Sequence, residues 1–346
     1  MTNERSLLIE PTHDDAGHEV GPTASPLPTP WRRVAVTGLL VAAFASIALV
    51  GFAWPAAHSA PRDVPVAVVA PPTAVDSLQQ SVEMRRPGAF ELAAVGTRAE
   101  ATRSLENGEV AGVIMLGPEG VEVLVASAAS PMLAQVVTGL ADALAGERAA
   151  QAGIEGPSAA VTDLAPTSQD DPRGAGLASA ILPLSFGGVV LGGLALFSIA
   201  GMMRQLALVL VTPVVTGAAV VGIVHGWLGS LSGNVLAEWG TMALAMTGIA
   251  TAVLGLGILV GRAGFSVVAV SVMLLGNPLA GIAGGPQTVP PGWAELGQAL
   301  PPGALLRALR SLSAFDGAGS GAAYLALTIW LVSGLGLLAI AASRRP

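Results

Sequence analysis

The sequence predicts a multi-pass α-helical membrane protein of about six transmembrane helices, with an extracytoplasmic α/β domain inserted between helices 1 and 2. Hydrophobic residues make up 52% of the 346 residues, charged residues make up only 11%, and the mean hydropathy is +0.68. Soluble domains usually carry about 25% charged residues. Separate apolar runs also reach the roughly 20 residues that cross a bilayer. Both observations favour a membrane protein over two soluble domains.

The apolar runs are the predicted spans. They cover residues 34–54, 177–201, 206–228, 241–260, 265–283 and 322–341. None of them contains Asp, Glu or Arg, and tryptophans lie near several of their ends, as is common at membrane interfaces. This gives a disordered cytoplasmic tail at 1–33, transmembrane helix 1 at 34–54, the inserted domain with its linker at 55–176, and a five-helix membrane domain at 177–346 with an outer Pro-rich segment at 284–321.

Arginine positions predict the orientation, because cytoplasmic loops are enriched in basic residues. Six arginines flank the spans on one side if the N-terminus is cytoplasmic: Arg32, Arg33, Arg204, Arg262, Arg344 and Arg345. We therefore expect a plasma (inner) membrane protein with both termini cytoplasmic and residues 55–176 outside. Arg307 and Arg310 are exceptions on the outer side.

The first span and the tail before it can each be interpreted in two ways. Ala57-His58-Ser59 resembles a signal-peptide cleavage site, but the apolar run is longer than the usual 7–15 residues, which favours a retained anchor. The tail before it is rich in Pro, Thr and acidic residues, which is typical of disorder. His13, Asp14, Asp15, His18 and Glu19 are read as solvated residues of this tail rather than as a metal site.

Alternating patterns predict a small α/β domain after the first span. The expected order is β-α-β-α-β-β-α with a partly parallel sheet. The expected elements are strands at 64–70, 90–95, 110–116 and 121–126 and helices at 76–84, 97–106 and about 130–150. Thr97 and Glu100 have the spacing of a capping box, and Asn107-Gly108 should end the second helix. Residues 153–173 read as a polar linker back to the membrane.

The composition excludes several kinds of chemistry. The chain has no Cys and no Lys, so thiolate chemistry and a phosphate-binding P-loop lysine are both unavailable. The domain holds 15 acidic residues against 7 Arg, which gives no support for nucleic-acid binding. Its carboxylates are spread over predicted helices and turns, and no nucleophile–base pair is visible. We expect no catalytic site, no metal and no cofactor, and an enzyme is the least favoured class.

The membrane half has small-residue patterns rather than charged ones. Pairs four residues apart occur at Gly188/Gly192, Gly257/Gly261 and Gly281/Gly285 and predict close helix packing, with a lipid-contacting groove as the alternative. Pro183 and Pro213 should kink the second and third spans. The absence of ionised residues within spans argues against an ion-coupled pump. His225 is read as an interfacial residue rather than a ligand.

Prolines break the segment 284–321 into short pieces. Leu305, Leu306, Leu309 and Leu312 form one apolar face of a short helix, with Arg307 and Arg310 at other positions. Such a helix would lie in the outer interface or re-enter between spans.

Three local features give the chain a family resemblance. The domain opens with a strand soon after the first span. The run Glu100-Ala101…Leu105…Gly108…Val110…Val113…Pro118 and the run Asn277-Pro278…Pro290…Trp293…Leu300-Pro301…Ala304…Leu309-Arg310 match degenerate family patterns. With the order of one span, an outer domain and five spans, residues 34–342 resemble the ABC type 2 transporter permeases, closest to their phage-infection-protein (Pip-like) branch.

The resemblance implies an exporter subunit that moves an amphipathic envelope substrate or drug outward. It implies a homodimer or paired permease in the lipid bilayer, with a separate ATPase subunit and no nucleic acid. A path between spans 2 and 5 would involve, or be supported by, Pro183, Gly188, Gly192, Asn277, Pro278, Pro301 and Arg310. One departure is the connection at 201–205, which is short for the coupling helix of such permeases. The alternative is a non-transporting envelope protein whose outer domain binds a protein or phage partner.

Overall fold

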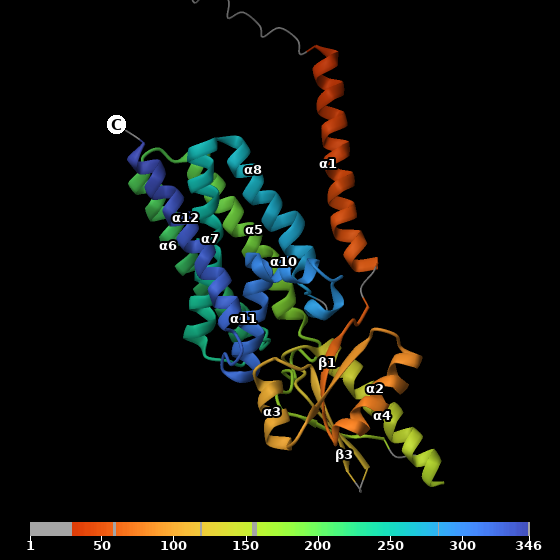
Figure 1. Ribbon diagram of the computed structural model, residues 1–346. Coiled ribbons are helices and arrows are strands. Elements are labelled where there is room, and N and C mark those ends of the chain that lie inside the picture. Colours follow the sequence, from red (N-terminus) through yellow and green to blue (C-terminus); the bar gives the residue numbers. More distant parts are fainter. Residues whose placement is uncertain (1–29, 58–59, 118–119, 154–157, 283, 345–346) are drawn as a thin grey trace, which may run out of the picture. The chain divides into compact units, whose positions relative to one another are not determined.

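The computed structural model describes residues 30–57, 60–117, 120–153, 158–282 and 284–344 (Figure 1). The chain forms two compact units, residues 1–46 and 47–346. Helix α1 (Trp31–Ala57) includes the whole of the predicted first span. The predicted tail up to residue 29, with its histidines and acidic residues, and the His58-Ser59 part of the cleavage-site motif lie outside the described residues.

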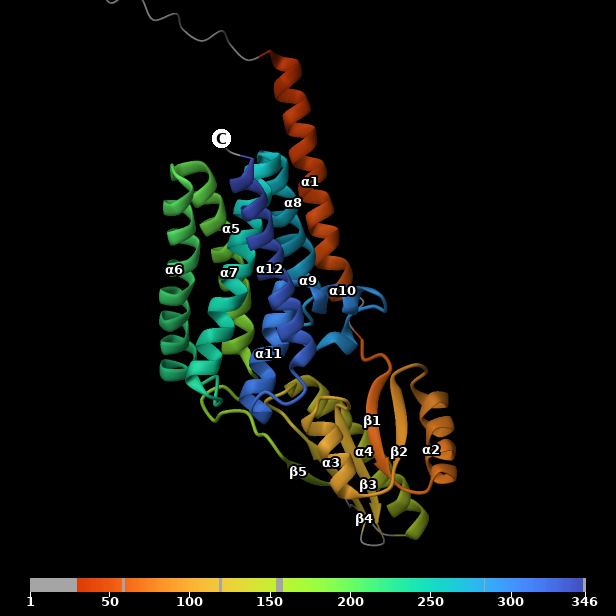
Figure 2. The same cartoon turned by 60° about the vertical axis from the view of Figure 1, so that its left-hand side comes forward.

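A mixed five-stranded sheet with three helices follows α1 (Figures 1 and 2). Its elements are β1 (Val64–Val69), α2 (Pro72–Arg85), β2 (Phe90–Val95), α3 (Arg98–Glu106), β3 (Gly112–Gly117), β4 (Gly120–Val125), α4 (Pro131–Ala152) and β5 (Ala160–Asp163). The predicted order β-α-β-α-β-β-α is confirmed up to α4. Thr97 Oγ1 accepts a hydrogen bond from the Glu100 N–H at 3.2 Å, so the predicted N-terminal cap of α3 is also confirmed.

The strand order is β2-β1-β3-β4-β5. Strand β1 pairs in parallel with both β2 and β3, β3 pairs antiparallel with β4, and β4 pairs in parallel with β5. Strand β5 therefore runs opposite to β1. The beginning of β1 and the end of β5 therefore lie at the same end of the sheet.

Helices cover both faces of the sheet, so its strands are apolar on both sides. On one face, Val66, Ile114 and Val123 pack with Val137 and Leu140 of α4. On the other face a smaller cluster contains Ala67, Val113 and Leu124 of the strands, with Ala101 and Leu105 of α3. This two-sided burial explains why the strands read as nearly continuous apolar runs.

Strand β5 was not predicted, because residues 153–173 read as a polar linker. Residues Ala160–Asp163 instead pair in register with Glu122–Val125 of β4. Asp163 fixes the end of the strand. Its Oδ1 accepts hydrogen bonds from the Ser127 and Ala165 N–H groups at 3.1 and 3.2 Å, and its Oδ2 accepts one from Ser127 Oγ at 2.5 Å. Side-chain acceptors thus hold a strand that is too short to be recognised from hydrophobic pattern.

Five helical segments of the described chain are long and apolar enough to cross a membrane, which makes this a multi-pass membrane protein. They are Ala175–Ser198, Met202–Trp227, Val235–Val260, Arg262–Leu279 and Gly321–Ser343. The elements are α5 (Ala175–Ser198), α6 (Met202–Val221) with the π-helical turn η1 (Gly222–Trp227), α7 (Val235–Val260), α8 (Arg262–Val270) with the π-helical turn η2 (Ser271–Gly276) and α9 (Asn277–Leu279), and α12 (Gly321–Ser343).

Helix α7 is the centre of the helical body, packed by α5, α6, α8, α11 and α12 (Figure 2). Gly188 and Gly192 of α5 face it. A Cβ at Gly192 would lie 2.6 Å from Val253 Cβ and 2.7 Å from the Ala250 carbonyl oxygen. The predicted role of this glycine pair in close helix packing is confirmed.

The prediction is half confirmed for Gly257/Gly261 and wrong for Gly281/Gly285. A Cβ at Gly257 would overlap Leu196 Cδ2 of α5, so Gly257 does pack closely on a neighbouring helix. Gly261, with φ 71°, separates α7 from α8, and no atom of a neighbouring element lies near its open side. Gly281 and Gly285 have φ values of 67° and 83°, and the Gly285 N–H donates to the Gly281 carbonyl at 2.7 Å. Positive φ values at these residues make turns, which end helices rather than pack them.

The Pro-rich segment folds into three short helices before α12: η3 (Pro286–Thr288), α10 (Trp293–Ala299) and α11 (Pro301–Phe315). The predicted apolar face of α11 is confirmed, because Leu305, Leu306, Leu309 and Leu312 are all buried in a cluster with α5, α7 and α12. The far end of α11 has a second partner, since Phe315 packs against the smaller core cluster of the sheet domain.

Candidate functional site

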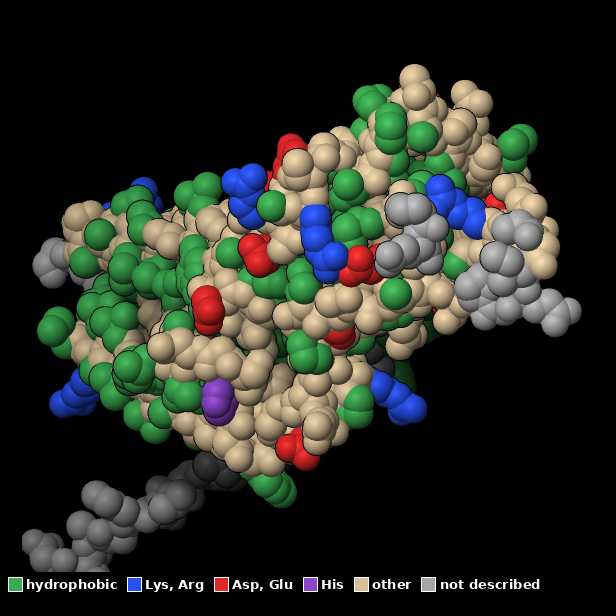
Figure 3. All heavy atoms as spheres, turned by 90° about the horizontal axis from the view of Figure 1, so that it is seen from below, with side chains coloured by type: hydrophobic (Ala, Val, Ile, Leu, Met, Phe, Trp, Pro, Cys, Tyr) green, Lys and Arg blue, Asp and Glu red, His purple; other side chains and the backbone are tan. Residues whose placement is uncertain are grey.

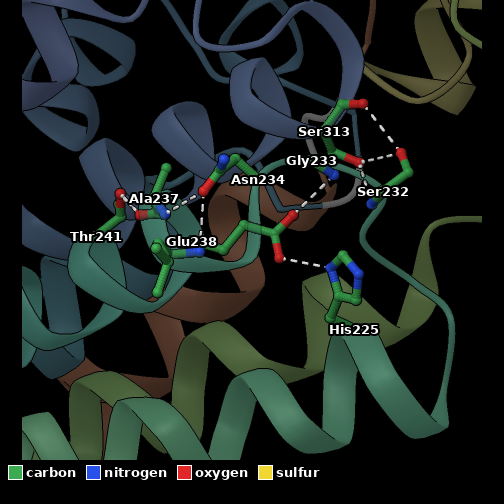
Figure 4. Close-up of polar contacts among 9 residues, drawn as sticks. His225, Ser232, Gly233, Asn234, Ala237, Glu238, Thr241 and Ser313 are labelled. Atoms are coloured by element: carbon green, nitrogen blue, oxygen red, sulfur yellow. Dashed lines mark hydrogen bonds and ion pairs between the residues drawn. The ribbon is translucent and has the colours of Figure 1, made fainter.

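Two polar features lie on and beside α11. The first is a polar cluster around the buried Glu238 at the beginning of α7, formed with His225, Ser232, Gly233 and Ser313 (Figure 4). The second is a cavity lined by Arg310, described below as the Arg310 cavity.

Asn234 sets the beginning of α7 and so places Glu238. Its Oδ1 accepts hydrogen bonds from the Leu236 and Ala237 N–H groups at 3.0 and 3.1 Å, which is a standard N-terminal cap. The helix therefore begins six residues before the predicted span at 241–260. Glu238 lies in its first turn, where the partial positive charge of the helix N-terminus favours a carboxylate.

Glu238 has no exposed surface, and both of its carboxylate oxygens are bonded. Oε2 lies 2.8 Å from His225 Nδ1, and Oε1 accepts a hydrogen bond from the Gly233 N–H at 2.9 Å. His225 comes from the π-helical turn η1, and its side chain is 27% exposed. Figure 4 shows the carboxylate between the imidazole and the Gly233 backbone. The pair joins the ends of two neighbouring candidate spans.

The same connection is tied to α11. The Ser232 N–H donates to Ser313 Oγ at 3.1 Å, and Ser232 Oγ donates to the Ser313 carbonyl at 3.0 Å. Gly233 approaches α11 so closely that a Cβ there would lie 2.5 Å from the Leu312 carbonyl oxygen. Only glycine fits this position without moving the backbone. The cluster thus fixes α6, α7 and α11 relative to one another.

The expectation that the spans contain no Asp, Glu or Arg is wrong, because the candidate span of α7 contains Glu238, and Arg204 and Arg262 lie near the beginnings of two others. The sequence placed Glu238 in a loop, because the predicted span began only at 241. The Asn234 cap lengthens the helix and brings Glu238 inside a candidate span. His225, read as an interfacial residue, is the partner of this carboxylate. A cap residue four positions before an acidic residue was the signal that could have revealed the longer helix.

The Arg310 cavity has a volume of about 270 Å³. It is lined by the end of α3 and the turn after it, by residues that follow β4 and begin α4, by the turn at 285–287 and by α11. Arg310 is half-buried in its wall, and its Nη2 donates to the Ile282 carbonyl at 2.8 Å. No carboxylate of the described residues forms an ion pair with it. Desolvation by burial lowers the pKa of Arg310 to about 10, so the guanidinium remains charged at neutral pH.

Only Arg310, among the candidate path residues named from the sequence, lines this cavity. Asn277 is buried, and its Nδ2 donates to the Val272 carbonyl at 3.1 Å, which satisfies an acceptor of the π-helical turn η2. Pro278 lies beside it in α9, and Pro301 is the buried first residue of α11. Gly188 and Gly192 pack on α7, while Pro183 lies inside α5 with its side chain exposed.

The surface seen in Figure 3 is neither uniformly positive nor uniformly negative. Arginine side chains and acidic side chains are interspersed on this face, and hydrophobic side chains gather toward one side of it. Interspersed charges of this kind do not produce the extended potential that attracts a polyanion. The uncompensated charge of Arg310 is instead a local feature of the cavity wall.

The chain is thus a multi-pass membrane protein with a mixed five-stranded α/β domain in its N-terminal half, a buried Glu238 paired with the partly exposed His225, and a cavity of about 270 Å³ beside Arg310. No protein-family model, curated protein or solved structure matches it.

Proposed function

We propose that the chain is the permease-like membrane subunit of an exporter of the ABC type 2 kind, which moves an amphipathic envelope molecule or drug outward with a separate ATPase. The observation that carries this proposal is the placement of α11. Its leucines are buried among α5, α7 and α12, and its Phe315 packs on the sheet domain. One helix therefore links the sheet domain to the membrane helices, as an exporter needs if its outer domain responds to substrate.

The proposed topology places both termini in the cytoplasm, the sheet domain outside and the spans in the plasma membrane. Arg204 lies in the first turn of α6, just after the α5–α6 connection, and Arg262 is the first residue of α8, just after the α7–α8 connection at Gly261. Both connections lie at one end of the helical body, and Arg344 follows α12 at that same end (Figures 1 and 2). Helix α11 and the sheet domain lie at the other end. Clustering of basic residues at one end supports a cytoplasmic assignment for that end.

Transport by this class requires two permease chains, so we expect a homodimer or a pair of related chains. The side chains of α6 and α12 are mostly exposed in the single chain. They are available for lipid or for a second copy.

Transport is tested in inside-out membrane vesicles. Vesicles from cells that produce the chain should accumulate a fluorescent amphipath when ATP is added, and vesicles from cells without the chain should not. A Walker-type ATPase should also co-purify with the chain in a gentle detergent. Equal, ATP-independent accumulation in both kinds of vesicle, together with purification free of any ATPase, would remove the proposal.

A second candidate function is favoured by the connection between α5 and α6, which consists of residues 199–201 alone. Gln205 Nε2 closes this corner by donating to the Ala195 and Ile199 carbonyls at 3.0 and 2.9 Å. Such a corner has no room for the coupling helix through which a permease engages its ATPase. A non-transporting envelope protein, whose outer domain binds a protein or phage partner, needs no such helix.

Crosslinking and vesicle transport together distinguish the exporter from the partner-binding envelope protein. If the second is correct, a photo-crosslinker at the exposed position Ser77 of the full-length chain should capture one defined partner, while the vesicles show no ATP-dependent accumulation. Flux without a crosslinked partner supports the exporter.

A further inference from the structure

We propose that the Arg310 cavity binds the anionic head, a carboxylate or a phosphate, of a small amphipathic molecule whose short apolar chain lies in the same cavity. The inference goes beyond the proposed function, because it concerns binding at one place and holds whether or not the chain transports anything.

The first step is the unused hydrogen-bonding capacity of Arg310. A guanidinium carries five N–H donors, and the one bond found for this side chain goes to the Ile282 carbonyl. None of its nitrogens is among the fully buried atoms that lack a partner, so the nitrogens without a hydrogen bond keep some exposed surface. A half-buried cation without a counter-ion is costly unless an anion reaches it.

The second step is the charge of the neighbouring wall. Arg307 lines the same cavity, and its Nη2 lies 3.5 Å from the Gly319 carbonyl oxygen. Glu106 is the one acidic residue of the lining, and it is exposed at the end of α3. Two arginines against one carboxylate leave a net positive charge, which selects an anion. Guanidinium groups bind carboxylates and phosphates with paired hydrogen bonds.

The third step is a buried acceptor in the same wall. Gln287 Oε1 is buried and has no hydrogen-bond partner. Because an unpaired buried oxygen is unfavourable, a small rotation of the Gln287 side chain toward a ligand O–H or N–H group would be favoured. A protonated phosphate oxygen or a hydroxyl beside a carboxylate supplies that donor.

The fourth step is the size and apolar character of the rest of the lining. Leu105, Leu133, Leu306 and Phe315 contribute apolar surface. A volume of about 270 Å³ is just below the roughly 300 Å³ at which drug-sized pockets begin. The cavity therefore suits a short chain with a charged end. A second cavity that Arg310 also lines has only about 20 Å³, room for about one water.

The test measures binding of octyl phosphate to the purified full-length chain in an uncharged detergent, by calorimetry. Octanol and inorganic phosphate are the two comparison probes. Octyl phosphate should bind with one site per chain, and tighter than either comparison probe. Arg310→Gln should weaken its binding about tenfold or more, and Arg307→Gln should weaken it less. The matched control is Arg103→Gln, an exposed arginine of α3 outside the cavity lining, which should leave binding unchanged.

Several outcomes overturn the inference. Octanol binding as tightly as octyl phosphate would show that charge plays no part. Equal binding of inorganic phosphate would show a site for a free anion and not for an amphipath. Unchanged octyl phosphate binding by folded Arg310→Gln would place the site elsewhere.

Thermal unfolding without ligand shows whether Arg310→Gln is folded. If it is not, a second variant tests whether octyl phosphate binds in the Arg310 cavity. Ala129→Phe fills the cavity from a lining position and leaves both arginines in place. Loss of octyl phosphate binding in this variant supports the inference, and retention overturns it.

Discussion

The Nδ1 atom of His225 lies 2.8 Å from the Oε2 atom of Glu238, a carboxylate without exposed surface at the first turn of a candidate membrane span. A buried carboxylate of this kind needs a partner, because an isolated charge in an apolar environment is strongly unfavourable. The imidazole and the Gly233 N–H supply it. The pair thereby joins the ends of α6 and α7, at the point where α11 is also attached.

The first prediction concerns this pair. His225→Ala should lower the free energy of unfolding by about 2–4 kcal/mol, because it leaves a buried carboxylate with the Gly233 N–H as its one partner. Glu238→Ala should cost a similar amount. The double variant should cost clearly less than the sum, with a coupling of about 1–3 kcal/mol. Thermal unfolding of the purified chain in detergent measures all three. The exposed Glu295→Ala is the matched control and should change little. Additive losses would show that the pair makes no specific interaction.

The second prediction concerns the packing of α5 on α7. Gly192→Ala should destabilise the chain by about 1–3 kcal/mol, because its Cβ would overlap Val253 and the Ala250 carbonyl. Gly240→Ala is the control within α7, where no atom of a neighbouring element lies within 4 Å, and it should be neutral or stabilising by up to about 1 kcal/mol. Unfolding temperatures of the two variants provide the comparison. Equal behaviour of both would contradict the close approach.

The third prediction concerns topology. The chain contains no cysteine, so a single introduced cysteine reports its own position. Ser77→Cys, exposed on α2, should react with a membrane-impermeant maleimide in cells whose outer surface is accessible. Ser343→Cys, exposed at the end of α12, should react only after the membrane is permeabilised. The reverse pattern would invert the proposed orientation, and labelling of both before permeabilisation would place the C-terminus outside.

The fourth prediction concerns the edge of the sheet. Asp163→Ala removes two hydrogen bonds from Ser127 that hold β5 against the segment after β4, and a third from the Ala165 N–H that closes the local turn. The backbone amides of Ala160–Asp163 should then exchange hydrogen faster, by about tenfold or more if about 1.4 kcal/mol of local stability is lost. Exchange in β1 should be unaffected. Glu91→Ala, at an exposed position of β2, is the control. Unchanged protection of β5 would mean that its pairing with β4 suffices.

Much of the fold was predictable because it depends on local pattern. The strand at 90–95 was predicted with its observed bounds, and the cap at Thr97 and the apolar face of α11 follow from residue spacing alone. Strand β5 was missed because four residues between Gly-rich and Pro-rich stretches carry almost no periodic signal. Its existence depends on pairing with β4 and on the Asp163 side chain, which are interactions between distant parts of the sequence.

The candidate site was less predictable, for a related physical reason. Arg310 was singled out, but its cavity is formed by the end of α3, the turn at 285–287 and α11, which lie far apart in sequence. Glu238 looked like a loop residue because hydrophobic pattern marks where a helix becomes apolar, and not where its hydrogen bonding begins. The Asn234 cap lies outside that pattern. Gly281 and Gly285 have helical spacing, yet their positive φ values place them in a turn.

The opposite chain directions of β1 and β5 have a consequence for protein engineering. The segment between them begins and ends at the same end of the sheet, with β3 and β4 between its first and last strands. A flexible linker in place of this segment would connect α1 to α5 without reversing the direction of either helix. We therefore expect that residues 64–163 can be replaced by another domain whose own first and last residues lie at one end of its sheet. Such a replacement would leave the chain direction of the five-helix body unchanged.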